Sequence, residues 1–153
     1  MSQKIIELYT DGASSGNPGP GGYGVVLLCN GHRRELSAGY ARTTNNRMEL
    51  LAVIAGLEAL KHDGCVVQAF SDSSYVVNAV EKQWLFRWER IRFKNVKNPD
   101  LWKRFLQVYR RHQVKFYWIK GHAGHPQNEC CDRLATAAAM RPNLPEDTGY
   151  SGH

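Results

Sequence analysis

The chain of 153 residues carries a formal net charge of +6, and its length indicates one domain that buries roughly two-thirds of its unfolded surface. Its four cysteines show no paired spacing, no apolar run approaches the ~20 residues of a membrane span, and no signal-peptide core follows the first residues. These features exclude a disulfide scaffold and a membrane-spanning protein, and they favour a reducing, cytoplasmic setting.

The first forty residues predict three successive strands, at residues 4–10, 23–29 and 33–40, with a hairpin turn at Asn30-Gly31. Between the first two strands lies YTDGASSGNPGPGGYG, where Asp11 ends a strand and opens a glycine-rich loop. This stretch contains G-x-G-x-x-G, but two prolines interrupt it and a strand follows, which excludes a dinucleotide fingerprint. A P-loop is excluded because no Gly-Lys-Ser/Thr is present.

The remaining elements alternate between helices and strands. The pattern predicts them, in chain order, as a strongly apolar helix over 48–60, a strand over 66–71, a helix over 73–82, a helix over 100–111, a strand over 114–118 and a helix over 128–140. This order predicts an α/β fold with a mixed sheet and helices on both faces, in a single domain over residues 1–140. We expect residues 141–153 to form a loosely ordered C-terminal tail.

Basic residues concentrate in residues 84–111, which hold nine of the twenty lysines and arginines but only two of the fourteen acidic residues. Aromatic residues, among them Trp84, Trp88 and Phe93, alternate with these bases. Bases hold phosphates, whereas aromatic rings either pack the segment down or contact the sugars and bases of a nucleic acid. A solvated helical face is the simpler alternative; we favour a nucleic-acid surface.

Four acidic residues stand where acids are uncommon. Asp11 and Asp72 each end a strand, and functional groups of open α/β sheets gather at strand ends. Glu49 begins an apolar stripe of its helix, and Asp132 borders the buried face of the last helix. Taken singly, each acid also has a structural alternative, as a helix cap, a residue that orders a loop or an ion-pair partner.

Taken together, the four carboxylates predict a divalent-cation site. Two carboxylates about 4 Å apart repel by about 4 kcal/mol at an effective dielectric of about 20, so four clustered acids must take up protons or bind cations. Oxygen ligands select Mg²⁺ first and Mn²⁺ next. Two such ions ~3.5–4 Å apart clamp the attacking and leaving oxygens of a phosphoryl displacement. With the basic segment, this predicts cleavage of a nucleic-acid backbone.

Four stretches, YTDGASSGNPGPGGYG, TTNNRMEL, FSDSSYV and WIKGHAGHPQNECCDRLA, closely resemble ribonuclease H type 1, in particular the bacterial ribonuclease HI enzymes. They occur in order across nearly the whole chain, each with one of the four acids, and EDTGY near the end also matches. The resemblance implies a five-stranded mixed sheet with three antiparallel strands first. It also implies an endonuclease that hydrolyses the RNA strand of RNA–DNA hybrids, leaving 3′-hydroxyl and 5′-phosphate ends.

The resemblance assigns catalytic roles to five residues. It implies up to two metal ions bridged by Asp11, with Glu49 and Asp132 tuning one ion each. Asp72 would hold the ion on the nucleophile side and orient the attacking water, and His122 would shuttle a proton or help eject the product. A zinc site that pairs the histidines of GHAGH with the two following cysteines is disfavoured, because neither C-x₂-C nor H-x₃-H spacing is present.

The resemblance also implies contacts to the hybrid. Glycines let the backbone approach a nucleic-acid groove, and asparagine amides both donate and accept, as reading a 2′-hydroxyl requires. Thr44 and Asn98 match positions that grip a phosphate of the DNA strand, with Lys97 nearby. The expected contacts come from the glycine stretch, the first helix and the basic protrusion at about 84–98: Gly12, Ser14, Gly16, Asn17, Thr44, Asn45, Asn46, Ser74, Trp84, Trp88, Lys97 and Asn98.

Several alternatives and departures stay open at this point. Asn45 and Asn46, beside a helix start, can also act as turn and cap residues. Ser74 stands where the bacterial enzymes commonly carry glutamine, and the protrusion is shorter and less rich in lysine than in well-known relatives. A catalytically silent hybrid-binding module and a DNA nuclease of the same fold are the competing functions. We expect a monomer with no obligate protein partner and no membrane association.

Overall fold

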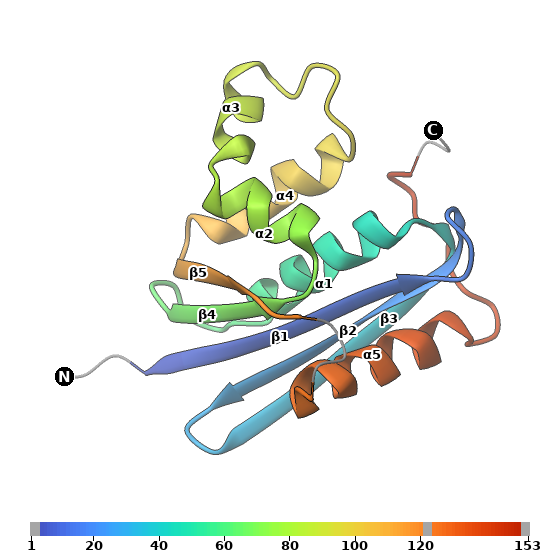
Figure 1. Cartoon of the computed structure of the whole chain (residues 1–153), viewed down its shortest axis with the longest axis horizontal. Coiled ribbons are helices and arrows are strands. Elements are labelled where there is room, and N and C mark those ends of the chain that lie inside the picture. Colours follow the sequence, from blue (N-terminus) through green and yellow to red (C-terminus); the bar gives the residue numbers. More distant parts are fainter. Residues whose placement is uncertain (1–3, 121–123, 151–153) are drawn as a thin grey trace.

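A computed structural model of the chain describes residues 4–120 and 124–150. The described residues form one sheet of five strands: β1 (Ile5–Ser14), β2 (Gly19–Cys29), β3 (His32–Thr43), β4 (Val66–Ser71) and β5 (Gln113–Trp118). The first three strands pair antiparallel, β4 joins β1 in parallel and β5 joins β4 in parallel, which gives the order β3-β2-β1-β4-β5 (Figure 1). The predicted five-stranded mixed α/β sheet with three antiparallel strands first is confirmed.

Helices cover both faces of this sheet, as predicted (Figure 1). The described helices are α1 (Asn45–Glu58), α2 (Ser74–Glu81), α3 (Trp84–Arg90), α4 (Pro99–Tyr109) and α5 (Pro126–Ala139). α1 packs on one face, where Gly56 leaves room for the Leu8 side chain of β1. α5 packs on the opposite face against β2. None of the described helices is long and apolar enough to cross a membrane.

The aromatic residues of α4 join the helical layer to the sheet. Trp102 and Phe105 are fully buried, and the Phe105 ring lies 6.1 Å from the Phe116 ring of β5. α3 and the loop that follows it lie beyond α2 and α4, away from the sheet (Figure 1). This part of the chain is the predicted basic protrusion, and the fold holds it beside the beginning of α4.

The glycine-rich stretch differs from its predicted form as a loop. β1 runs on to Ser14 and β2 begins at Gly19, so only a short turn separates the paired strands, and Asp11 lies inside β1 opposite Gly24. The prediction that Asp11 ends its strand is therefore wrong. The glycines serve helix packing instead of a loop. A Cβ on Gly12 would collide with the backbone of α1, and a Cβ on Gly24 would collide with the backbone of α5.

The C-terminal segment (residues 141–150) lies against the domain, unlike the loose tail that the sequence predicted. On β3, the Ala41 N–H donates to the Pro145 carbonyl at 2.8 Å. The Asp147 carboxylate accepts from Arg47, a residue 100 positions earlier in the chain. The prediction failed because the proline-rich composition of the segment does not reveal that its Asp147 pairs with a buried arginine on α1.

Candidate active site

Three of the four singled-out acids come together at one end of the sheet. Carboxylate oxygens of Asp11, Glu49 and Asp72 all lie within 4.8 Å of one another. The strand register explains this meeting: Tyr9 of β1 pairs in parallel with Phe70 of β4, so the residues two positions further on reach the same edge and the same face. Glu49, near the start of α1, brings the third carboxylate to these two. We call these three residues the acid cluster.

Burial and mutual repulsion raise the pKa values in the acid cluster. Burial raises the pKa of Asp11 to about 7, and the charges of Asp72 and Asp132 act in the same direction, whereas the neighbouring Glu49 carboxyl and the hydrogen bond from the Gly12 amide lower it. Burial, followed by the charge of Asp11, raises the pKa of Glu49 well above its ordinary value. The metal-free cluster therefore keeps protons near neutral pH, and a bound cation would displace them.

One oxygen of Glu49 tests whether the acid cluster fits a metal ion. Glu49 Oε1 accepts from the Gly12 N–H at 2.7 Å, whereas Oε2 is buried and has no hydrogen-bond partner within the described residues. A buried carboxylate oxygen without a donor costs free energy. A divalent cation would satisfy it, and a donor set made only of oxygens suits hard ions. The residues present fit such an ion.

The backbone of Asp72 is fixed from both sides. Asp72 directly follows β4, and the cap of α2 is Ser73, whose hydroxyl accepts from the Val76 N–H at 3.3 Å. The alternative that Asp72 caps α2 is therefore wrong. On the other side, Trp118 at the end of β5 donates from Nε1 to the Asp72 carbonyl at 3.1 Å. The Asp72 carboxylate lies in the acid cluster.

The structure does not place the other two predicted catalytic residues in the acid cluster. Asp132, half-buried on α5, lies outside the 4.8 Å group, yet its charge still raises the pKa of Asp11. His122 lies outside the described residues. Its role in proton transfer or product release stays a prediction.

A groove of about 550 Å³ opens beside the first turn of α1; we call it the α1 groove. Five of the predicted hybrid contacts line it: Asn17, Thr44, Asn46, Lys97 and Asn98. Arg42 and Tyr150 also line it, and the sequence interpretation missed both. Arg42 and Lys97 are exposed cations, and the amide and hydroxyl groups between them are hydrogen-bond donors. Such a lining suits the phosphates of a nucleic-acid strand.

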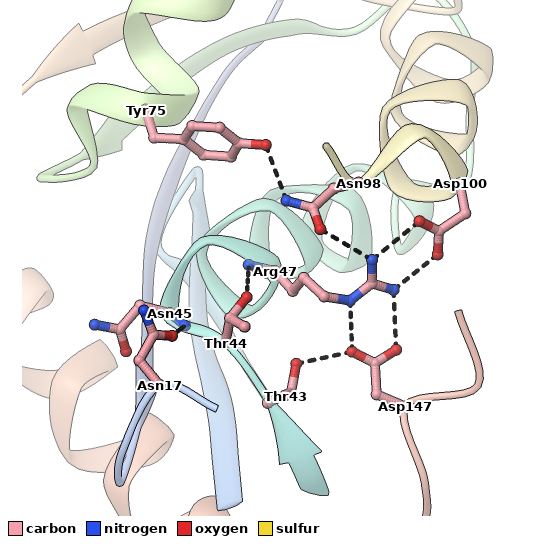
Figure 2. A network of polar contacts seen from close by, with 9 residues as sticks. All are labelled: Asn17, Thr43, Thr44, Asn45, Arg47, Tyr75, Asn98, Asp100 and Asp147. Atoms are coloured by element: carbon pink, nitrogen blue, oxygen red, sulfur yellow. Dashed lines mark hydrogen bonds and ion pairs between the residues drawn. The ribbon is translucent and has the colours of Figure 1, made fainter. Parts of the chain in front are cut away.

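Polar side chains tie the turn after β1 to the start of α1. Asn45 Oδ1 accepts from the Ser14 N–H at 2.7 Å, and Asn17 Oδ1 accepts from the Asn45 N–H at 3.0 Å (Figure 2). The cap of α1 is Thr44, whose hydroxyl accepts from the Arg47 N–H at 3.3 Å, so the alternative that Asn45 or its neighbour caps the helix is wrong. Three of the predicted contacts, Ser14, Asn17 and Asn45, are therefore joined by hydrogen bonds at the start of α1.

Three further predicted contacts are Gly12, Gly16 and Ser74. The Gly12 N–H donates to Glu49, so it supports the cluster. Gly16 is exposed in the turn, with a φ of 85°, in the left-handed region that glycine favours. Ser74 is exposed at the first position of α2, two residues after Asp72. Gly16 and Ser74 are thus accessible to a ligand.

The protrusion divides into an outer basic side and an inner aromatic side. Trp88 packs edge-on against buried Trp102 at 5.7 Å, and Phe93 is 8% exposed, so these rings hold the protrusion down. Trp84 is half-buried, with the Lys82 ammonium 5.5 Å from its ring centre. Exposed bases follow the outer side: Arg87, Arg90, Arg92, Lys94 and Lys97. The bases, more than the rings, are placed to meet a polyanion.

A second charged group, the Arg47 network, borders the α1 groove, because Arg47, Asn98 and Asp100 are among the residues that line it; Figure 2 shows its hydrogen bonds and ion pairs. Arg47 is 2% exposed and pairs with Asp100 and Asp147, each at 2.7 Å. Burial raises the pKa of Asp100, but the hydrogen bonds and the charge of Arg47 outweigh it and hold this pKa below its ordinary value. The sequence signal that could have found Arg47 is its place directly before the apolar part of α1.

Comparison with known proteins agrees with this fold and this arrangement of residues. A family model described as RNase H matches residues 3–140. The chain is 61% identical over 149 residues to a protein of Desulforamulus reducens named ribonuclease H, an alignment that covers 94% of this chain and 93% of that one.

Solved structures show the same similarity. The crystal structure of LC9-RNase H1, a type 1 RNase H with the type 2 active-site motif, matches with a TM-score of 0.81 and 33% identity, over 91% of this chain and 74% of the other. LC11-RNase H1 in complex with an RNA/DNA hybrid matches with a TM-score of 0.66 and 29% identity, over 88% of this chain and 96% of the other.

Proposed function

Because this chain belongs to the ribonuclease H family, we propose that it hydrolyses the RNA strand of RNA–DNA hybrids and leaves 3′-hydroxyl and 5′-phosphate ends. Family membership at 61% identity over nearly the whole chain makes it a nucleic-acid hydrolase of the ribonuclease H type. The hybrid as substrate is supported by LC11-RNase H1, a structural relative whose crystals contain such a hybrid.

We propose that Asp11, Glu49, Asp72 and Asp132 hold up to two Mg²⁺ ions, which Mn²⁺ can replace. When bound, such ions stabilise charge on the attacking and leaving oxygens of the phosphodiester. The chain holds the carboxylates in place for this chemistry: the Gly12 N–H orients Glu49, and Trp118 holds the Asp72 backbone.

We propose that three surfaces bind the hybrid: the α1 groove, the start of α1 with the turn at Gly16, and the outer side of the protrusion. Thr44, Lys97 and Asn98 in the α1 groove would take phosphates of the DNA strand, because the groove offers cations and hydrogen-bond donors at this point. The asparagines at the start of α1 and the exposed turn at Gly16 would meet the RNA strand, where 2′-hydroxyls distinguish RNA from DNA. The outer bases of the protrusion would add salt-dependent affinity.

The observation that carries this proposal is the convergence of three acids from distant parts of the chain, two of them buried, with one Glu49 oxygen unpaired among the described residues. The test compares a labelled RNA–DNA hybrid, duplex DNA and duplex RNA, each with Mg²⁺ or with a chelator. We expect cutting of the RNA strand of the hybrid with Mg²⁺ alone. Equal cutting of duplex DNA would show that the protein is a DNA nuclease. Binding of the hybrid without cutting would show that it is a catalytically silent binding module.

We also propose that the protein acts as a monomer in the cytoplasm. The α1 groove and the acid cluster are both built from one chain, so the proposed site needs no second copy. Light scattering on the purified protein tests the monomer, and cell fractionation tests the compartment. A dimer at working concentration, or a membrane-bound or exported protein, would contradict these expectations.

A further inference from the structure

The C-terminal segment reaches the α1 groove at two points. Asp147 accepts from Arg47 Nε at 2.7 Å and from Arg47 Nη2 at 3.0 Å (Figure 2), and the Tyr150 ring lies 5.5 Å from the Arg42 guanidinium. We propose that this segment is a positioning element for hybrid binding: Asp147 acts through Arg47 on Asn98, and Tyr150 acts on Arg42. The inference rests on the proposed function, because it assumes that the α1 groove binds the hybrid.

Arg47 is a bridge and not itself a ligand for the substrate. A guanidinium has five N–H donors, and Arg47 makes five hydrogen bonds: two to Asp147, two to Asp100 and one to Asn98. Because its donors are all engaged and its side chain is 2% exposed, none is left for a phosphate. Any influence of Arg47 on binding must pass through its partners.

Asn98 and Asp100 are the partners of Arg47 that line the α1 groove, and of the two only Asn98 has N–H donors to offer a phosphate. A guanidinium only donates, so the Asn98 oxygen must face Arg47, at 3.2 Å from Nη1. The Asn98 amide nitrogen then donates one hydrogen to the Tyr75 hydroxyl at 3.0 Å. The second amide hydrogen is left for an oxygen in the groove. Two fixed partners thus hold the side chain with a donor towards the site of the proposed phosphate.

The C-terminal segment is held as one piece. The Tyr150 N–H donates to the Asp147 carbonyl at 3.0 Å, so one turn presents both the carboxylate and the ring. Gly149 between them has no room for a side chain, because a Cβ would collide with the Asp100 carboxylate and come within 2.9 Å of Arg47 Nη2. A change at Asp147 therefore disturbs Tyr150 as well, and the two contacts act together on the groove.

Positioning and simple charge predict opposite outcomes for one substitution. Asp147 adds a negative charge behind a groove that we propose holds phosphate. If charge alone acted, Asp147→Asn would tighten hybrid binding, because repulsion would fall. If positioning dominates, the same substitution weakens binding, because an amide nitrogen cannot accept from Arg47 and the guanidinium loses its hold on Asn98. The sign of the effect separates the two explanations.

The experiment measures hybrid affinity by fluorescence anisotropy without Mg²⁺, and KM and kcat with Mg²⁺, for Asp147→Asn and Tyr150→Leu. The matched control is Glu146→Gln, which removes the same charge from an exposed neighbour that takes part in no hydrogen bond or ion pair within the described segment. We expect Kd and KM to rise roughly 3- to 10-fold for the two variants, with kcat within about twofold of wild type. Glu146→Gln should match wild type, and Tyr150→Phe should recover the affinity lost in Tyr150→Leu.

The outcomes separate this inference from the function on which it rests. If the wild-type protein does not cut the hybrid, the proposed function fails. If the wild type cuts but Asp147→Asn and Tyr150→Leu bind as tightly as Glu146→Gln, or more tightly, the positioning role is overturned. If Asp147→Asn does not fold, Tyr150→Leu alone decides by the same criterion, since its ring lies at the edge of the groove.

Discussion

Two buried charged groups begin on the same turn of α1, and they differ in whether the protein itself compensates their charge. In the Arg47 network, the guanidinium is saturated by two carboxylates and an amide. In the acid cluster, Glu49 lies beside two more carboxylates that raise its pKa, and one of its oxygens has no partner within the described residues. Compensated charge holds the fold together, whereas uncompensated charge marks a place that requires a ligand.

Substitutions in the acid cluster, whose charge is uncompensated, should lower the cleavage rate most. Asp11→Asn and Asp72→Asn should each lower the initial rate of hybrid cleavage in Mg²⁺ by at least roughly a thousandfold, because each removes a carboxylate ligand while it keeps the shape of the side chain. Asp63→Asn, at an exposed acid that pairs with Arg111, is the control and should cut at the wild-type rate. Near-normal cleavage by Asp11→Asn would remove the acid cluster from the mechanism.

Stability should change in opposite directions in the two groups. Arg47→Met leaves the Asp147 carboxylate buried without its partner, and we expect a loss of about 3 kcal/mol in the free energy of unfolding. Glu49→Gln in metal-free buffer should instead raise that free energy, because glutamine is neutral without the cost of protonating a buried carboxyl among like charges. Urea unfolding of the two variants measures both changes in the free energy of unfolding. Changes of the same sign would contradict the distinction between compensated and uncompensated charge.

The raised pKa of Asp11 should make the stability of the metal-free protein depend on pH. Its pKa lies near 3.8 when unperturbed, as in the unfolded chain, and at about 7 in the folded, metal-free protein, so the unfolded chain releases the proton first. The free energy of unfolding should therefore fall as the pH rises from about 4 to about 7, by at most roughly 4 kcal/mol, and level off above.

The control for this pH dependence is Asp11→Asn. It should flatten the curve, and saturating Mg²⁺ should restore stability to the wild type above pH 7 by binding the folded state. A wild-type curve that rises through this pH window, or one that the substitution leaves unchanged, would show that Asp11 is not buried among like charges.

The smallest expected effect concerns the Asp72 backbone. Trp118→Phe removes the hydrogen bond from Nε1 to the Asp72 carbonyl and keeps most of the ring. We expect a loss of about 1 kcal/mol in stability and a few-fold rise in the Mg²⁺ concentration that gives half-maximal cleavage. Tyr117→Phe, at an exposed ring one position earlier on β5, is the matched control. Equal Mg²⁺ requirements in the two variants would show that this contact does not serve the acid cluster.

The sequence allowed the strands and the acids to be predicted because both rest on local patterns. β4 was predicted with the bounds that the structure has, and Asp72 was correctly placed directly at its end. The meeting of Asp72 with Asp11 was predicted because functional groups of open α/β sheets gather at strand ends, and the repulsion within such a cluster then predicted bound protons or a cation. These inferences need residue type and strand order alone.

The sequence could not reveal what depends on contacts between distant segments. The glycines of the first stretch were interpreted as a loop for nucleic acid, yet Gly12 and Gly24 make room for helix backbones that arrive much later in the chain. Asp147 looked like one more acid in a polar tail, and its partner Arg47 lies 100 residues away. Such pairings have no local period, so composition and spacing could not show them.

Anomalous diffraction from crystals of the wild-type protein soaked in Mn²⁺ shows whether the acid cluster holds divalent cations. We expect an anomalous peak within ligand distance of Asp11, Glu49 and Asp72, next to the Glu49 oxygen that has no protein partner in the described structure. Well-ordered density for the three carboxylates with no anomalous peak among them at saturating Mn²⁺ would contradict this expectation.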